Sequence, residues 1–180
     1  MDFPVDIVSL MVSRLHAYEG RPQDGPRPDP EPVGRTEVEI RADLGIVGDR
    51  YFGQTVHRNA AITVIDAAAL DELAGTLGLA EPPDPRLSRR NITLRGYPID
   101  DLAAHRAADG TRVDGRRFTL DSGAGPITFR ANRPANPCAW MDTVFGPGAM
   151  KALRGRGGVR TTPLTSGVLR VGPAVLTVLD

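Results

Sequence analysis

The sequence has very few of the residues that build disulfides and metal clusters. Cys138 is its one cysteine, and three histidines are scattered among 180 residues. A single thiol excludes an intrachain disulfide, and this spacing of histidines does not match a structural zinc site. These absences favour a cytoplasmic protein that is kept reduced.

Net charge and long apolar runs are absent as well. Lysine plus arginine and aspartate plus glutamate both total 22, so the formal net charge is zero. This balance argues against nucleic acid or an anionic membrane as a partner. No run of about 18 apolar residues and no basic-then-apolar signal region occurs, so we expect no membrane insertion and no export.

Lysine is nearly missing, because Lys151 is the only one and the other basic residues are arginines. A guanidinium binds phosphate or carboxylate through two parallel hydrogen bonds, so this bias is compatible with an anion site. Codon usage rich in G and C would produce the same bias, and the composition does not separate the two explanations.

Short segments of alternating or β-branched residues dominate the rest of the chain. They predict strands over residues 5–12, 36–41, 61–65, 92–94, 117–121, 127–130, 168–171 and 175–179. Asp66 is a suitable N-cap for a helix that ends at Gly78, and a second, interrupted helix is expected over 141–153. The pattern predicts one domain over residues 1–180, mainly β, with a closed β-barrel and about two to three helical insertions.

Three segments are expected to be turns or loops. Residues 21–34 contain five of the prolines and should form an exposed loop within the domain. Residues 154–158, Arg-Gly-Arg-Gly-Gly, are expected to be flexible and cationic. Gly172 and Pro173 are expected to form a turn between the last two strands.

The clearest candidate for a reactive group is Cys138, within Arg133-Pro134-Ala135-Asn136-Pro137-Cys138-Ala139-Trp140. Pro134 and Pro137 stiffen this stretch, and a stiff loop holds a reactive atom at low entropic cost. A thiol surrounded by arginines would be a good nucleophile or metal ligand. The alternative is that Cys138 is a small apolar side chain in the core.

Two further stretches carry candidate anion-binding residues. Gly48-Asp49-Arg50, followed by His57, sits among glycines that allow tight turns around a charged group. Arg90 and Asn91 open the predicted strand 92–94, where a guanidinium and an amide suit a phosphate or a polar ring edge. A surface ion pair in the first stretch and a solvated strand start in the second are the structural alternatives.

Taken together, these stretches resemble the MOSC domain family, named after the C-terminal domain of molybdenum-cofactor sulfurase. The resemblance is carried by Gly48-Asp49-Arg50, Arg90-Asn91-Ile92, Pro137-Cys138 and the closing stretch Gly167–Gly172, in the family's order. It implies a β-barrel and a cysteine that binds molybdenum or carries a persulfide sulfur.

By that resemblance, Cys138 would be the catalytic residue and the metal ligand of a pterin molybdenum cofactor. Arg50, Arg90 and Asn91 would line the pocket for the pterin phosphate, and His57 joins them because Tyr51 stands where many relatives have histidine. The implied function is a small oxidoreductase that reduces N-hydroxylated compounds with electrons from a redox partner protein. The alternative is a non-catalytic carrier that delivers sulfur or cofactor from Cys138.

Overall fold

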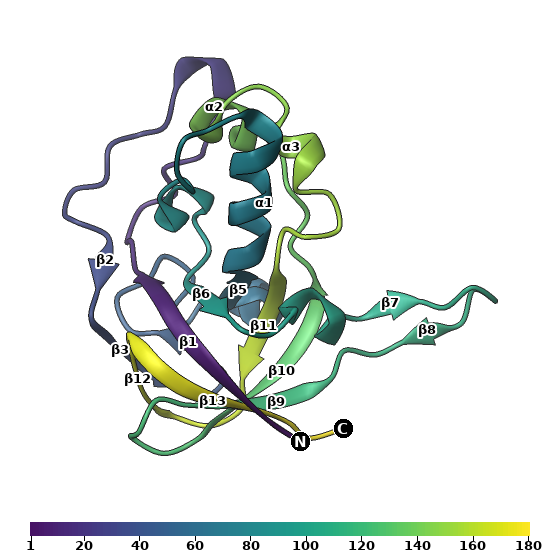
Figure 1. The fold of residues 1–180 in the computed structure, drawn as a ribbon. Helices are drawn as coiled ribbons and strands as arrows, with labels where there is room; N and C mark the ends of the chain where they lie inside the picture. Colours follow the sequence, from purple (N-terminus) through teal and green to yellow (C-terminus); the bar gives the residue numbers. More distant parts are fainter.

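The computed structural model describes residues 1–180, and its central feature is a closed β-barrel (Figure 1). Seven strands follow one another in the order β13-β9-β10-β11-β5-β6-β1, and pairing of β1 with β13 closes the ring. β5 and β6 run parallel, while the other neighbours are antiparallel. The strands are β1 (Asp2–Met11), β5 (Ile62–Asp66), β6 (Ile92–Arg95), β9 (Arg117–Asp121), β10 (Ile127–Pro134), β11 (Val159–Pro163) and β13 (Gly172–Val178). The prediction of a mainly β, closed barrel is confirmed.

The barrel is filled by apolar side chains from strands that alternate between inside and outside. In β9, for example, Phe118 and Leu120 are fully buried while Arg117 is exposed, which is the period of two that a half-buried strand requires. Phe118 stacks on Phe129 of β10, with ring centroids 5.3 Å apart. The interior is therefore a packed core of 24 buried residues, and any ligand site must lie at its rim or outside.

Two small sheets are attached to the barrel. One has the order β12-β3-β4, and the other is a hairpin of β7 and β8 that projects from the body (Figure 1). The bounds are β2 (Gly34–Arg35, paired with β1), β3 (Glu37–Arg41), β4 (Gly45–Ile46), β7 (His105–Arg106), β8 (Arg112–Val113) and β12 (Gly167–Arg170). The sequence pattern does not predict this hairpin.

The expected turn at Gly172 and Pro173 is wrong. β12 pairs with β3 of the small sheet, whereas β13 pairs with β1 and β9 of the barrel, so the chain passes from one sheet to the other and does not fold back. Pro173 lies opposite Asp6 at the start of β13, a position at which a strand tolerates a missing N–H.

Three α-helices lie over one end of the barrel (Figure 1): α1 (Ala67–Leu77), α2 (Trp140–Phe145) and α3 (Ala149–Ala152). α1 begins as predicted, because the Asp66 side chain accepts a hydrogen bond from the N–H of Ala68, and it ends at Gly78 in the left-handed conformation (φ 67°). The three helices share a second apolar core of nine residues, which includes Trp140. Short 3₁₀ helices are η1 (Pro22–Asp24), η2 (Thr55–Ala60), η3 (Pro85–Ser88) and η4 (Ile99–Leu102). No helix is both long enough and apolar enough to cross a membrane.

The Arg-Gly-Arg-Gly-Gly loop at residues 154–158 is packed at its glycine end, which contradicts the expectation of flexibility. Gly157 and Gly158 are buried, and a Cβ on either would overlap a backbone carbonyl, that of Ala135 or Val64. The N–H of Gly158 donates to Asp100 (2.8 Å), and its carbonyl accepts from the N–H of Ala135 (2.7 Å). Glycine is present here because backbone segments meet closely.

Candidate functional site

Cys138 lies in the segment between the end of β10 and the start of α2, and its side chain is exposed. The segment is fixed on both sides, because Ala135 is 1% exposed and Trp140 is 7% exposed. The reading of Cys138 as a buried core residue therefore does not hold. The thiol is presented to solvent by a loop whose two ends are anchored in the fold.

Cys138 borders a small open cavity of about 160 Å³, below the size range of typical small-molecule pockets. Fourteen residues line this cavity, and they include four arginines but neither aspartate nor glutamate. The arginines are Arg50, Arg89, Arg90 and Arg160. A thiol beside clustered guanidinium groups is suited to soft-metal coordination at one point and anion binding at another.

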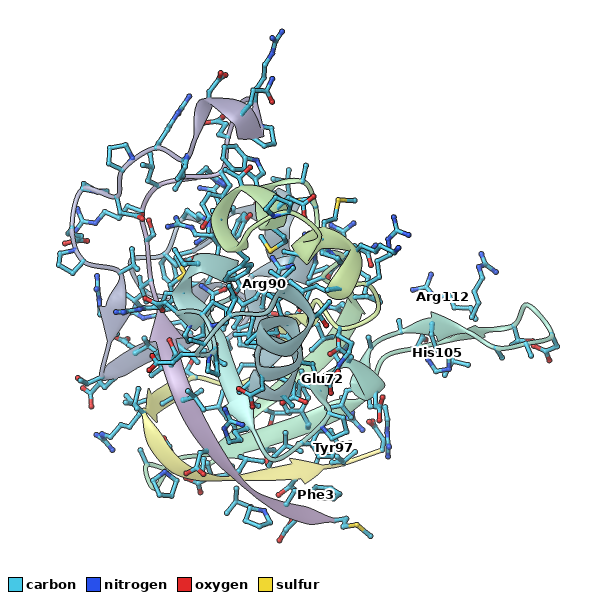
Figure 2. The ribbon with its side chains drawn as sticks, turned by 45° about the horizontal axis from the view of Figure 1, so that its top comes forward. Phe3, Glu72, Arg90, Tyr97, His105 and Arg112 are labelled. Atoms are coloured by element: carbon cyan, nitrogen blue, oxygen red, sulfur yellow. The ribbon has the colours of Figure 1, made fainter.

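Arg90 is held in place by its own hydrogen bonds. Its Nε donates to the carbonyl of Gly157 and its Nη2 to the carbonyl of Ala135, both at 2.9 Å. Nη1 has no acceptor in the protein and is not a fully buried atom, so it is left to the cavity. Burial and the charge of Arg160 lower the pKa of Arg90 to about 10, against the raising effect of Cys138 and Tyr51. Figure 2 shows Arg90 in the body of the molecule, whereas Arg112 stands on the projecting hairpin.

Arg160 is one of the cavity residues that were not expected from the sequence. It lies on β11, where Val159 on one side and Thr161 on the other are buried, so its side chain leaves the barrel on the opposite face. It forms no ion pair, and burial followed by the nearby Arg133 lowers its pKa. Its outward position on a strand shortly after Gly157 and Gly158 could have suggested a place at the site. An outward arginine on a strand usually points to solvent, however, so this position alone does not predict a cavity residue.

Arg50 and Asn91 have different surroundings. The Arg50 guanidinium borders the cavity, contacts Asp49 (3.2 Å) and the carbonyl of Arg89 (3.2 Å), and lies 4.6 Å from the centre of the Tyr51 ring. Asn91 is fully buried and does not border the cavity. Its amide donates to the carbonyl of Met11 and to Asp49, and its oxygen accepts from the N–H of Thr63. Asn91 thus joins separate chain segments behind the site.

His57 lies next to the cavity without bordering it. Its ring is 4.7 Å from that of Tyr51, which does border the cavity, and 6.4 Å from that of His16. Burial, followed by the charge of Arg50 and by His57, lowers the pKa of His16, so its imidazole is neutral near pH 7. These three rings lie together at one side of the cavity.

A second wall of the cavity is aromatic and is tied to the proline-rich segment. Tyr18 stacks on Trp140, with centroids 5.1 Å apart and planes 12° apart, and burial raises the pKa of Tyr18 to about 12. Arg89 lies over Tyr18 and pairs with Asp29 (2.7 Å) of the proline-rich segment. Residues 21–34 are therefore attached to this wall by the Arg89–Asp29 ion pair and by hydrogen bonds such as that from the N–H of Arg27 to the carbonyl of Ala17 (2.8 Å).

The residues present fit both ends of a pterin molybdenum cofactor in their chemistry. The exposed thiol suits the metal, while the free Nη1 of Arg90 and the unpaired guanidinium of Arg160 suit the phosphate. No group of three or more histidine, cysteine, aspartate or glutamate residues could hold a metal ion by itself. A metal bound through Cys138 would take its other ligands from outside the protein chain.

This protein shares its fold with several proteins of known structure. No protein-family model and no curated protein matches this sequence. YuaD from Bacillus subtilis superposes with a TM-score of 0.69 at 13% identity, over 98% of this chain and 96% of that one. YiiM from Geobacillus stearothermophilus gives 0.62 at 18% identity, over 98% and 75%, and YiiM from Escherichia coli gives 0.54 at 14%, over 100% and 70%. The chain has the same barrel architecture as these proteins.

Proposed function

We propose that this protein is a MOSC-type oxidoreductase that binds a pterin molybdenum cofactor and reduces N-hydroxylated compounds. The observation that carries the proposal is the exposed Cys138 at a cavity with four arginines and no carboxylate. The order of the sequence motifs and the barrel fold shared with YuaD and YiiM support it.

In this proposal each residue has a distinct task. Cys138 provides the sulfur ligand, and Arg90 and Arg160 bind the phosphate. Asn91 acts indirectly, because it fixes the segments behind Arg50 and Arg90. The rings of His16, Tyr51 and His57 stand at the mouth, where they can hold or deliver protons.

The bound cofactor would supply two-electron chemistry. Reduction of an N-hydroxyl compound to the amine takes two electrons and two protons and releases water. In this proposal the electrons come from a redox partner protein.

A second function has support from the exposure of the thiol. Because Cys138 is accessible to a large partner, it could carry a persulfide sulfur or hold the cofactor for delivery, without catalysing a reaction itself. The cavity arginines would then orient the cargo.

The test is metal and pterin analysis of protein purified from a host that makes the cofactor. Stoichiometric molybdenum and pterin in the wild type, lost in Cys138→Ala, supports cofactor binding. Reduction of an N-hydroxylated compound by the loaded wild type with a chemical reductant supports the oxidoreductase over the carrier. Arg160→Gln should weaken retention by about 10-fold to 100-fold, since a charge-assisted bond is worth roughly 1.5–3 kcal/mol. Arg154→Gln, an exposed arginine that does not border the cavity, is the matched control.

Other outcomes separate the alternatives. Protein without metal but with one cyanide-labile sulfur on Cys138 supports the carrier. Protein with neither, from a host in which another molybdenum enzyme is loaded normally, refutes both functions.

A further inference from the structure

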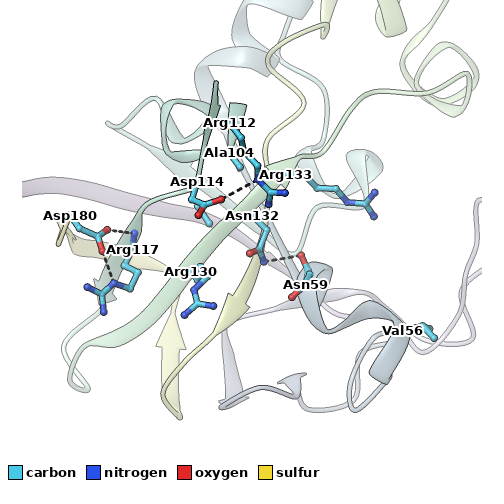
Figure 3. A pocket seen from close by; sticks show the side chains of 12 residues that line it. Val56, Asn59, Ala104, Arg112, Asp114, Arg117, Arg130, Asn132, Arg133 and Asp180 are labelled. Carbon is cyan, nitrogen blue, oxygen red and sulfur yellow. Dashed lines mark hydrogen bonds and ion pairs between the residues drawn. The ribbon is translucent and has the colours of Figure 1, made fainter. Parts of the chain in front are cut away.

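A cleft of about 770 Å³, which we call the arginine cleft, is lined by none of the residues that surround Cys138 (Figure 3). Its walls come from η2, from β8 of the projecting hairpin and from β9 and β10 of the barrel. None of the residues that line it also lines the cavity at Cys138. The cleft is thus a separate site, and its size lies within the range of small-molecule pockets.

The arginine cleft carries more positive charge than its own carboxylates neutralise. Four arginines and two aspartates line it. Arg112 pairs with Asp114 at 3.1 Å, and Arg117 pairs with Asp180 at 2.6 Å. Arg130 and Arg133 have no carboxylate within ion-pair distance, and their guanidinium groups form no hydrogen bond within the protein. Two guanidinium groups on one strand are therefore free to bind an anion.

A break in the strand pairing accounts for the position of Arg133. The register of β10 against β11 shifts between Ala131 and Pro134, which marks a bulge. In a regular strand Arg133 would share the inward face of Ala131, which is 1% exposed. The bulge turns Arg133 outward, so that it borders the same cleft as Arg130. Such irregularities often re-aim a side chain at a functional site.

The lining also limits the kind of ligand. No aromatic side chain borders the cleft, so nothing there can stack on a nucleobase or another ring. The amide of Asn132 is already used by the carbonyl of Asn59 (2.9 Å) and by Thr162 (3.0 Å). Recognition must therefore rest on the guanidinium forks, which bind phosphate or carboxylate through paired hydrogen bonds.

We propose that the arginine cleft binds a small, non-aromatic anion with two or more phosphate or carboxylate groups, held by Arg130 and Arg133. Their exposed side chains point to different sides in Figure 3 and would turn toward the bound anion. This proposal does not rest on the function proposed for Cys138, although the charge of Arg133 also acts on Arg160 at that cavity. An anion with several charges is favoured over a single one, because two unpaired guanidinium groups border one cavity of this size.

The test is calorimetric titration of the purified protein with pyrophosphate and, separately, with citrate, in 50 mM and 150 mM salt. The wild type should bind one equivalent of at least one probe, and the better probe identifies a phosphate or a carboxylate ligand. Arg130→Gln/Arg133→Gln should lose at least tenfold in affinity. Both side chains are exposed, so this variant should keep the thermal stability of the wild type.

The control variant is Arg21→Gln/Arg154→Gln. It removes the same charge from two exposed arginines that form no ion pair and do not line the cleft. Its affinity should stay within about threefold of the wild type, since distant exposed charges are screened at these salt concentrations. No saturable binding of either probe, or an equal loss in the control, overturns the proposal.

Discussion

Asp100, at the start of η4, is expected to make the stability of this protein fall as the pH rises through the weakly acidic range. Its carboxylate accepts the N–H of Gly158 at 2.8 Å, next to the carbonyl of Gly157 that holds Arg90. Burial raises the pKa of Asp100 from 3.8 to about 6, and the nearby Asp66 adds to this effect. The folded state therefore binds a proton more tightly than the unfolded state.

The sign and size follow from that difference. Between pH 4 and pH 6 the folded state holds more protons, so the free energy of unfolding decreases as the pH rises. A pKa difference of about 2 corresponds to roughly 3 kcal/mol for a fully buried group. Asp100 is partly exposed, so solvent screening reduces this to about 1–2 kcal/mol.

Asp100→Asn isolates the effect, because the amide oxygen can still accept the N–H of Gly158 but carries no charge. We expect the variant to be more stable than the wild type by about 1–2 kcal/mol at pH 7.5, and equally stable at pH 4. Urea unfolding at pH 4, 5, 6 and 7.5 measures this. A variant that is less stable at pH 7.5, or a difference that does not change with pH, would refute the reasoning.

Three further predictions concern the surroundings of the site. Cys138→Ala should change the free energy of unfolding by less than about 0.5 kcal/mol, since the thiol is exposed, and native wild-type protein should be labelled completely by iodoacetamide; a protected thiol would contradict this. Gly158→Ala should cost about 3 kcal/mol in urea unfolding, because its φ is +93° and a Cβ would overlap the carbonyl of Val64; an unchanged midpoint would show that the loop can shift. Asp29→Asn should lower the free energy of unfolding by about 2 kcal/mol, because it breaks the ion pair with the Arg89 side chain, which is 8% exposed. The same variant should be cleaved faster by a protease within residues 21–34. An unchanged cleavage rate would mean that other contacts hold the segment.

The sequence predicts those parts of the fold that have local causes. Asp66 and Gly78 define both ends of α1, because capping depends on the residues at the helix ends. The strands follow from alternation, and many short strands imply a barrel. The parts that depend on distant partners are not visible: β12 and β13 look like one hairpin until their separate partners are known.

The same distinction applies to the candidate site. The motifs place Arg50, Arg90 and Cys138, and the structure brings all three to one cavity. Asn91 belongs to the same sequence motif as Arg90. Its hydrogen-bond partners come from three separate segments, so only the fold shows that Asn91 is buried behind the site. Arg160 could not be predicted from the sequence either. An outward residue on a strand borders a cavity only if other segments of the fold cover that face of the strand, and the local sequence does not show this.

The pairing of β1 with β13 joins residues about as far apart in the chain as possible, such as Asp2 and Thr177. During synthesis β1 emerges first, and one of its edges stays open until the last strand arrives, so the barrel cannot close on a growing chain. Contacts over such separations form slowly, because the loop-closure entropy is lost before any contact energy is gained. The two ends of the chain also lie side by side (Figure 1). A circular permutant with a short linker between residues 180 and 1 and new ends at the hairpin tip would make this pairing local, and it should fold faster while keeping the cavity at Cys138 unchanged.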